Sequence, residues 1–112
     1  MTLVDVLDAA AAELEGVQRR GSGSVIEWSA GGPPFAACAG ATADFRLKPA
    51  VLRAALGTVD TGPSDRGPDW IRFRPVELDR FALDRATSWF VSASRHATPS
   101  RPEPGGQGRG AT

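Results

Sequence analysis

Two runs of residues separated by a dipeptide constrain the fold more than any other feature of this sequence. Phe35–Ala39 and Thr42–Leu47 are joined only by Gly40-Ala41, and a connection of that length is typical of a β-hairpin. Apolar and polar residues alternate along the second run, as they do along a strand. We therefore expect one face of this hairpin to be buried and the other to be wet or covered by a ligand.

Two further segments are typical of strands. Ser24–Trp28 is short, β-branched and aromatic, and Asp69–Arg74 alternates apolar with polar residues. Arg19–Gly23 breaks the pattern before the first of them. Thr58–Pro68 is so rich in Gly and Pro that it is predicted to be a loop. The sequence thus predicts four strands, of which the first three form an antiparallel meander.

Apolar residues at helical spacing predict three helices. The first is predicted over Leu3–Leu14, with Thr2 as its N-cap. The second covers residues 49–56, with proline at its first position and glycine after its last. The third begins near Glu77 or Asp79. Its apolar stripe consists of Leu78, Ala82, Ala86, Trp89, Phe90 and Ala93.

The predicted fold is a two-layer α+β domain over residues 1–97, in the order α-β-β-β-α-β-α. Its mainly antiparallel, four-stranded sheet is expected to carry the helices on one face. The composition, 41% hydrophobic and 23% charged, is ordinary for a folded chain. Thr98–Gly110 offers no apolar side chain to bury, so residues 98–112 are predicted to form a disordered Pro/Gly-rich tail.

The charge balance and the chain start bear on partners and location. Thirteen basic and thirteen acidic residues cancel, so the field that gathers polyanions is missing and duplex DNA is not the favoured partner. A single cysteine, a start without a basic region and the lack of a long apolar run predict a cytoplasmic protein outside the membrane. Either a monomer or a homodimer is compatible with the sequence.

Catalytic signals are weak. Cys38 and His96 are the only residues of their types, so neither a zinc site of the familiar kinds nor a nucleophilic triad is predicted. No glycine-rich phosphate cradle occurs. We expect no catalytic residue, cofactor or metal. An enzyme remains the alternative, and it would depend on acid–base chemistry by Glu27, Asp44 or Asp69.

The most distinctive stretch is the loop Ser64–Asp69, which leads into Trp70. Here Arg66 follows a hydroxyl and a carboxylate residue and precedes glycine, a setting in which a guanidinium can present its fork to an anion. Arg46 and Lys48, at the end of the third predicted strand, can join it. The predicted ligand-binding residues are therefore Arg66, Ser64, Arg46, Lys48 and Trp70, with a small anion or a protein as partner.

A plainer use of the same residues remains open. Arg66 can tie the loop down through a salt bridge to Asp65 or Asp69, which is the commoner role of such an arginine. Core packing is likewise the commoner role of the three tryptophans, Trp28, Trp70 and Trp89.

Three segments carry a family resemblance: Asp44–Pro49, Arg66–Phe73 and Asp79–Phe90. They resemble the small actinobacterial proteins grouped as a luciferase-domain family, and also the MmcQ/YjbR-like proteins, over about residues 3 to 97. The resemblance implies a compact α+β fold with a tryptophan-containing strand and a closing helix. The luciferase label brings no active-site residues to map. The MmcQ/YjbR likeness implies DNA binding, which here would need a common surface for Arg19, Arg20, Arg46, Arg72 and Arg74.

Overall fold

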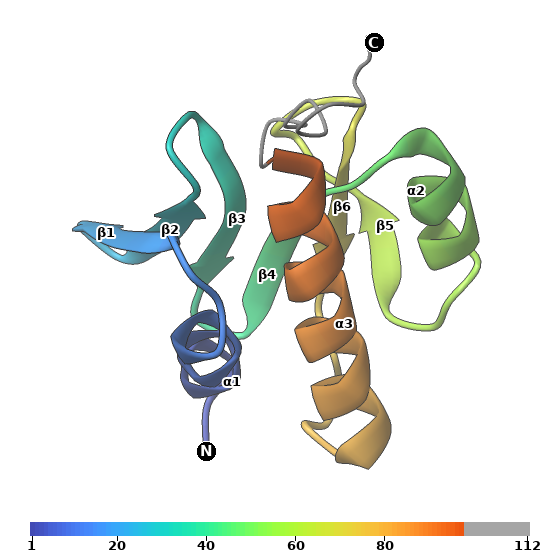
Figure 1. The fold of residues 1–112 in the computed structure, drawn as a ribbon. Coiled ribbons are helices and arrows are strands. Elements are labelled where there is room, and N and C mark those ends of the chain that lie inside the picture. Colours follow the sequence, from blue (N-terminus) through green and yellow to red (C-terminus); the bar gives the residue numbers. More distant parts are fainter. Residues whose placement is uncertain (98–112) are drawn as a thin grey trace, which may run out of the picture.

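A computed structural model describes residues 1–97, and the tail predicted over 98–112 lies outside them (Figure 1). The described part holds three helices and six strands. In chain order these are α1 (Leu3–Ala12), β1 (Gln18–Ser22), β2 (Val25–Ser29), β3 (Pro34–Ala39), β4 (Thr42–Arg46), α2 (Pro49–Leu56), β5 (Thr61–Pro63), β6 (Trp70–Phe73) and α3 (Arg80–Ala97).

The strands form one antiparallel sheet in the order β1-β2-β3-β4-β6-β5. The expected β3–β4 hairpin is confirmed, with Gly40 at its turn in the left-handed region at φ 61°. The chain then leaves through α2 and returns, so that β6 pairs with β4 and β5 lies outside β6. The mixed α+β class and the antiparallel sheet are therefore as predicted.

The predicted number of strands and the predicted order of elements are wrong. The described order is α-β-β-β-β-α-β-β-α. β1 lies where a break was predicted, because its mostly polar residues pair along the outer edge of the sheet and need no alternating apolar pattern. β5 lies within the predicted loop Thr58–Pro68, where Thr61, Gly62 and Pro63 pair with β6.

The helices begin where their capping residues predict. Thr2 caps α1 through a capping box in which its hydroxyl accepts from the Asp5 amide while the Asp5 carboxylate accepts from the Thr2 amide. α1 ends two residues before the predicted Leu14. α2 has proline at its start, as predicted. At α3, Asp79 Oδ1 accepts from the Ala82 amide at 2.9 Å, so the helix starts one residue later, at Arg80.

The core lies between the sheet and the pair α1 and α3, which both pack on one of its faces (Figure 1). Phe90 of α3 meets Trp28 of β2 and Phe35 of β3 edge-on, with ring centroids 5.5 and 5.1 Å apart. Trp89 packs on Phe73 with centroids 5.1 Å apart. Alanines on the buried stripe of α3 let its backbone approach the sheet: Ala82, Ala86 and Ala93.

α2 lies beside β5 and β6, at the end of the sheet away from α1 (Figure 1). Neither α1 nor α3 covers the opposite face of the sheet, called the open face below. Within residues 1–97 no helix is both long and apolar enough to span a bilayer.

Candidate functional site

A row of charged residues crosses the open face at one level of the sheet. Strand register places Glu27 opposite Ala37, Ala37 opposite Asp44, and Asp44 opposite Arg72. Residues directly opposite one another in a sheet share a face. The flanking residues of β4, Ala43 and Phe45, point into the core instead, which leaves the Asp44 row on the open face.

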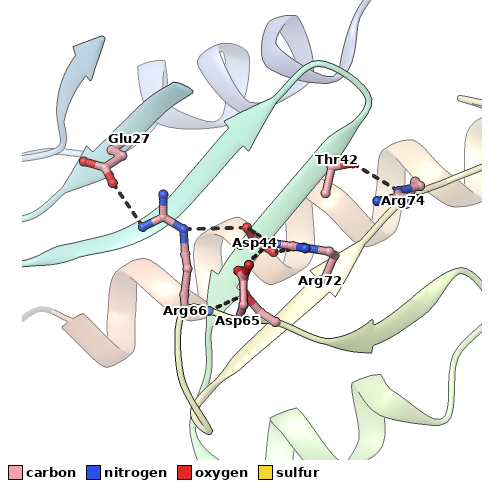
Figure 2. A network of polar contacts seen from close by, with 8 residues as sticks. Glu27, Thr42, Asp44, Asp65, Arg66, Arg72 and Arg74 are labelled. Atoms are coloured by element: carbon pink, nitrogen blue, oxygen red, sulfur yellow. Dashed lines mark hydrogen bonds and ion pairs between the residues drawn. The ribbon is translucent and has the colours of Figure 1, made fainter. Parts of the chain in front are cut away.

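Two arginines converge on the Asp44 carboxylate (Figure 2). Arg72 donates from Nε to Asp44 Oδ1 at 3.0 Å and from Nη2 to Oδ2 at 3.3 Å, while Arg66 Nε lies 3.6 Å from Oδ2. Each arginine also holds a second acid: Arg72 Nη2 lies 2.8 Å from Asp65 Oδ1, and Arg66 Nη1 lies 3.0 Å from Glu27 Oε2. These five residues form the charge network of the open face.

The hydrogen bond to Asp44 is the main reason that the pKa of Arg72 rises above its ordinary value, with the Asp44 and Asp65 charges adding to it. Arg66 reaches Glu27 by spanning β3 above Ala37, because Ala37 lies between Glu27 and Asp44 in the register. The small side chain at Ala37 leaves room for this crossing, and Ala37 is almost fully buried.

The loop before β6 is shaped to aim Arg66 across the face. Ser64 Oγ accepts from the Arg66 amide at 3.1 Å, a local bond that sets the turn. The next residue, Gly67, has φ 152°, and a Cβ there would lie 3.4 Å from Trp70 Cδ1. The Arg66 guanidinium carbon lies 5.2 Å from the Trp70 ring centroid, a cation–π contact. Trp70 therefore supports the arginine and belongs to the open face, not to the core.

The remaining predicted site residues lie at the Trp70 end of the face. Arg46 is directly opposite Trp70 in the β4–β6 pair. Lys48 is the exposed N-cap position of α2, next to Leu47, whose amide donates to the Asp69 carbonyl at 2.9 Å. The structure thus brings Arg46, Arg66 and Trp70 together. Ser64 orders the loop, and Lys48 lies beyond the end of the strand.

The alternative prediction for Arg66, a salt bridge that ties the loop down, is right about the salt bridge and wrong about the acids that form it. Arg66 does tie its loop to the sheet, but through Glu27 and Asp44 and not through Asp65 or Asp69. Asp65 binds Arg72 instead. Sequence reasoning did not identify Arg72 as a member of this network, in which it binds Asp44 and Asp65. The alternation of apolar and polar residues along β6 indicates that Arg72 faces away from the core. It does not predict which carboxylate binds Arg72.

The three carboxylates of the enzyme alternative are not grouped as a catalytic pair. Both Asp44 oxygens face arginine nitrogens, and Glu27 is held by Arg66 (Figure 2). Asp69 directly precedes β6, and its carbonyl accepts a hydrogen bond from the Leu47 amide. Among residues 1–97, no set of three or more His, Cys, Asp or Glu side chains is placed to hold a metal ion.

Four of the five arginines needed for a DNA-binding surface share the open face. Arg20 pairs with Glu27 in the register, and Arg46, Arg72 and Arg74 follow from the alternation of β4 and β6. Arg19 lies on the helix face, where its Nε is 3.1 Å from Asp8 Oδ1 of α1. The predicted surface is therefore incomplete, and Arg72 on it is bound by two acids.

Cys38 is buried, and its thiol donates to the Gly40 carbonyl at 3.6 Å. Burial, with smaller contributions from the Asp8 and Asp44 charges, raises the pKa of the Cys38 thiol to about 11. This suits an inert packing residue. His96 lies in the last turn of α3.

No protein-family model, no curated protein and no solved structure matches this chain significantly.

Proposed function

We propose that this protein is a non-enzymatic binding module that takes a small multivalent anion on its open sheet face, at the Trp70 end. The observation that carries the proposal is the juxtaposition of Arg46, Arg66 and Trp70 on a face that neither α1 nor α3 covers. Arg46 and Arg66 would bind the anion, and Trp70 would hold Arg66 in position. A cytoplasmic location remains part of this proposal.

The distribution of charge favours an anion. The open face carries the arginines Arg20, Arg46, Arg66, Arg72 and Arg74 against the acids Glu27, Asp44 and Asp65. The acids gather along the Asp44 row. In the part of the chain that the structure describes, no carboxylate pairs with Arg46 or Lys48. At the Trp70 end this leaves Arg46 and Lys48 as positive charge without an acidic partner, and Arg20 and Arg74, which also pair with no carboxylate among residues 1–97, lie elsewhere on the face.

Arg66 is already organised for such a contact. Its Nη1 lies 3.0 Å from Glu27 Oε2 and its Nε lies 3.6 Å from Asp44 Oδ2. A guanidinium carries five N–H donors, so it can hold these acids and still donate to a ligand. Because the cation–π contact with Trp70 fixes its position, little side-chain entropy is lost on binding.

Calorimetric titration with pyrophosphate tests the proposal. Arg46→Gln and Arg66→Gln should each weaken binding about tenfold, the loss of one charge-assisted contact. Arg74→Gln is the matched control: it removes the same charge from the same face, at the end of β6 away from Trp70 and next to Thr42. Equal losses in all three variants would show attraction to the general charge and not a site. No binding of pyrophosphate would overturn the proposal.

DNA binding is the second candidate, favoured by the four arginines of the open face and by the MmcQ/YjbR resemblance. Its signature is a steep fall of affinity with salt. Fluorescence anisotropy with a short labelled duplex at several salt concentrations distinguishes the two functions. Duplex affinity that falls steeply with salt and weakens in both Arg46→Gln and Arg74→Gln would favour DNA. Absent or salt-insensitive binding would remove this candidate.

A further inference from the structure

A second candidate site lies on the helix face of the sheet, away from the charge network. A pocket of about 620 Å³ opens between four segments that are distant in the sequence. They are the start of α1, the β1–β2 hairpin, the β3–β4 turn and the connection from β6 to α3. The chain's N-terminus and the start of α3 lie at the same end of the molecule (Figure 1).

The pocket has an apolar wall. Its lining includes Leu3 and Val4 of α1, Ile26 of β2, Ala41 in the β3–β4 turn and Leu78 before α3. Pockets of about 300 to 1,000 Å³ with a mostly apolar lining and few polar groups are the usual size and character of small-molecule sites.

Two large apolar side chains stand exposed at this pocket. Met1 is 87% exposed and Val76 is 88% exposed, and both belong to its lining. Exposed apolar side chains beside an apolar pocket gain from any ligand that covers them. The occupant must therefore offer a substantial apolar surface.

The charge at the pocket indicates which polar head group the ligand carries. Among the described residues that line it, Arg19 alone carries a charged side chain. The guanidinium is half exposed and uses its Nε on Asp8, 3.1 Å away. An ion pair this exposed contributes little stability, so a second carboxylate can share or replace it.

We propose that this pocket binds a single-chain anionic amphiphile of the medium-chain fatty carboxylate class. The alkyl tail lies between Leu3, Ile26 and Leu78, and the carboxylate meets Arg19 at the rim. This site is independent of the anion site on the open face, since Arg19 and Arg46 lie on opposite faces of the sheet.

Calorimetric titration with octanoate, decanoate and decylammonium, all below their micellar concentrations, separates tail from head group. Each buried methylene raises affinity about fourfold, so decanoate should bind up to about fifteenfold more tightly than octanoate. Equal affinities would overturn the placement of the tail. Decylammonium should bind more weakly than decanoate; equal or tighter binding would overturn the assignment of the head group.

Two pairs of variants locate the site. Val76→Glu should weaken decanoate binding about fivefold or more, because its carboxylate repels the ligand at the mouth. Val59→Glu is its control, since Val59 is 62% exposed and does not line this pocket. Both changes are at exposed positions, so both variants should fold. Equal effects of the two would place decanoate elsewhere.

The second pair concerns Arg19. Arg19→Gln should weaken decanoate binding while Arg53→Gln, an exposed arginine on α2, leaves it unchanged. Asp8→Asn should tighten decanoate binding, because it frees the Arg19 guanidinium from its present partner. Tighter binding in Asp8→Asn is not expected of a merely structural ion pair. Unchanged decanoate affinity in both Arg19→Gln and Asp8→Asn would overturn the role of Arg19.

Discussion

Arg72 is bound by two carboxylates, one buried and one exposed. The two ion pairs therefore allow the effect of burial on stability to be compared with the effect of distance. Asp65 approaches more closely, with Arg72 Nη2 to Asp65 Oδ1 at 2.8 Å, but its side chain is 82% exposed. Asp44 lies at 3.0 Å from Arg72 Nε with a side chain 10% exposed. We predict that the longer but buried pair contributes more stability.

The magnitudes follow from solvent screening. Asp44 accepts two charge-assisted hydrogen bonds from Arg72 where little water competes, so their coupling should be about 2 kcal/mol. The exposed Asp65–Arg72 pair should contribute about 0.5 kcal/mol or less. The single change Asp44→Ala should cost about 2–3 kcal/mol, because it leaves Arg66 and Arg72 without their shared acceptor. In a domain of this size that lowers Tm by roughly 10–20 °C.

Two double-mutant cycles measure these couplings, one for Asp44 with Arg72 and one for Asp65 with Arg72, each built from alanine variants. Urea unfolding followed by tryptophan fluorescence is a suitable assay, since Trp28 is fully buried and Trp89 packs on Phe73. The cycle for Asp44 removes the separate effect on Arg66, which both the single and the double variant share. A coupling for Asp65 equal to or larger than that for Asp44 would refute the reasoning.

Three further predictions concern the core, the thiol and the first helix. Phe90→Ala should cost about 3–5 kcal/mol because Phe90 is fully buried, whereas Phe81→Ala, at a residue 66% exposed, should change the free energy of unfolding by no more than about 0.5 kcal/mol; urea unfolding measures both. The pKa of Cys38 lies at about 11 in the folded state against an ordinary value of 9.0, so the folded state holds the thiol proton more tightly. Stability should therefore fall as pH rises from 9 towards 11, and a smaller fall in Cys38→Ala checks this. Thr2→Ala should cost about 1 kcal/mol by removing the cap of α1, as thermal unfolding will show. The hydrogen bond from the Thr2 backbone amide, followed by the contact with the Thr2 hydroxyl, lowers the pKa of Asp5, so the capping box should weaken as pH falls through the range in which that carboxyl gains a proton.

Elements with strong local signals were predictable from the sequence. α2 begins at Pro49 and ends before Gly57, and the β3–β4 hairpin turns at Gly40, since these residues have backbone preferences that hold in any tertiary context. β1 and β5 were not predictable in this way. Each is an edge strand that is stabilised by its one neighbour, so the pairing partner and not the side-chain pattern decides its structure.

In the candidate site, too, some features were predictable from the local sequence and others depended on tertiary contacts. Alternation along the strands was enough to place Asp44 and Arg46 on a polar face, and glycine beside Arg66 marked a loop that could present it. The partners of Arg66 were not predictable, because they depend on the register between β2, β3 and β4 and on the path of the loop across them. For Trp70, both a ligand-binding role and a role in the core were open, because sequence alternation cannot say which face of β6 meets the helices.

The two edges of the sheet differ in a way that limits how copies of this chain can assemble. At the β5 edge, Pro63 has no amide hydrogen to offer, and α2 lies alongside, with the Thr61 hydroxyl donating to the Ala55 carbonyl at 3.1 Å. At the other edge, β1 leaves its outer backbone groups accessible. Two copies that join through their β1 edges would form a two-fold pair with a β5 edge at each end.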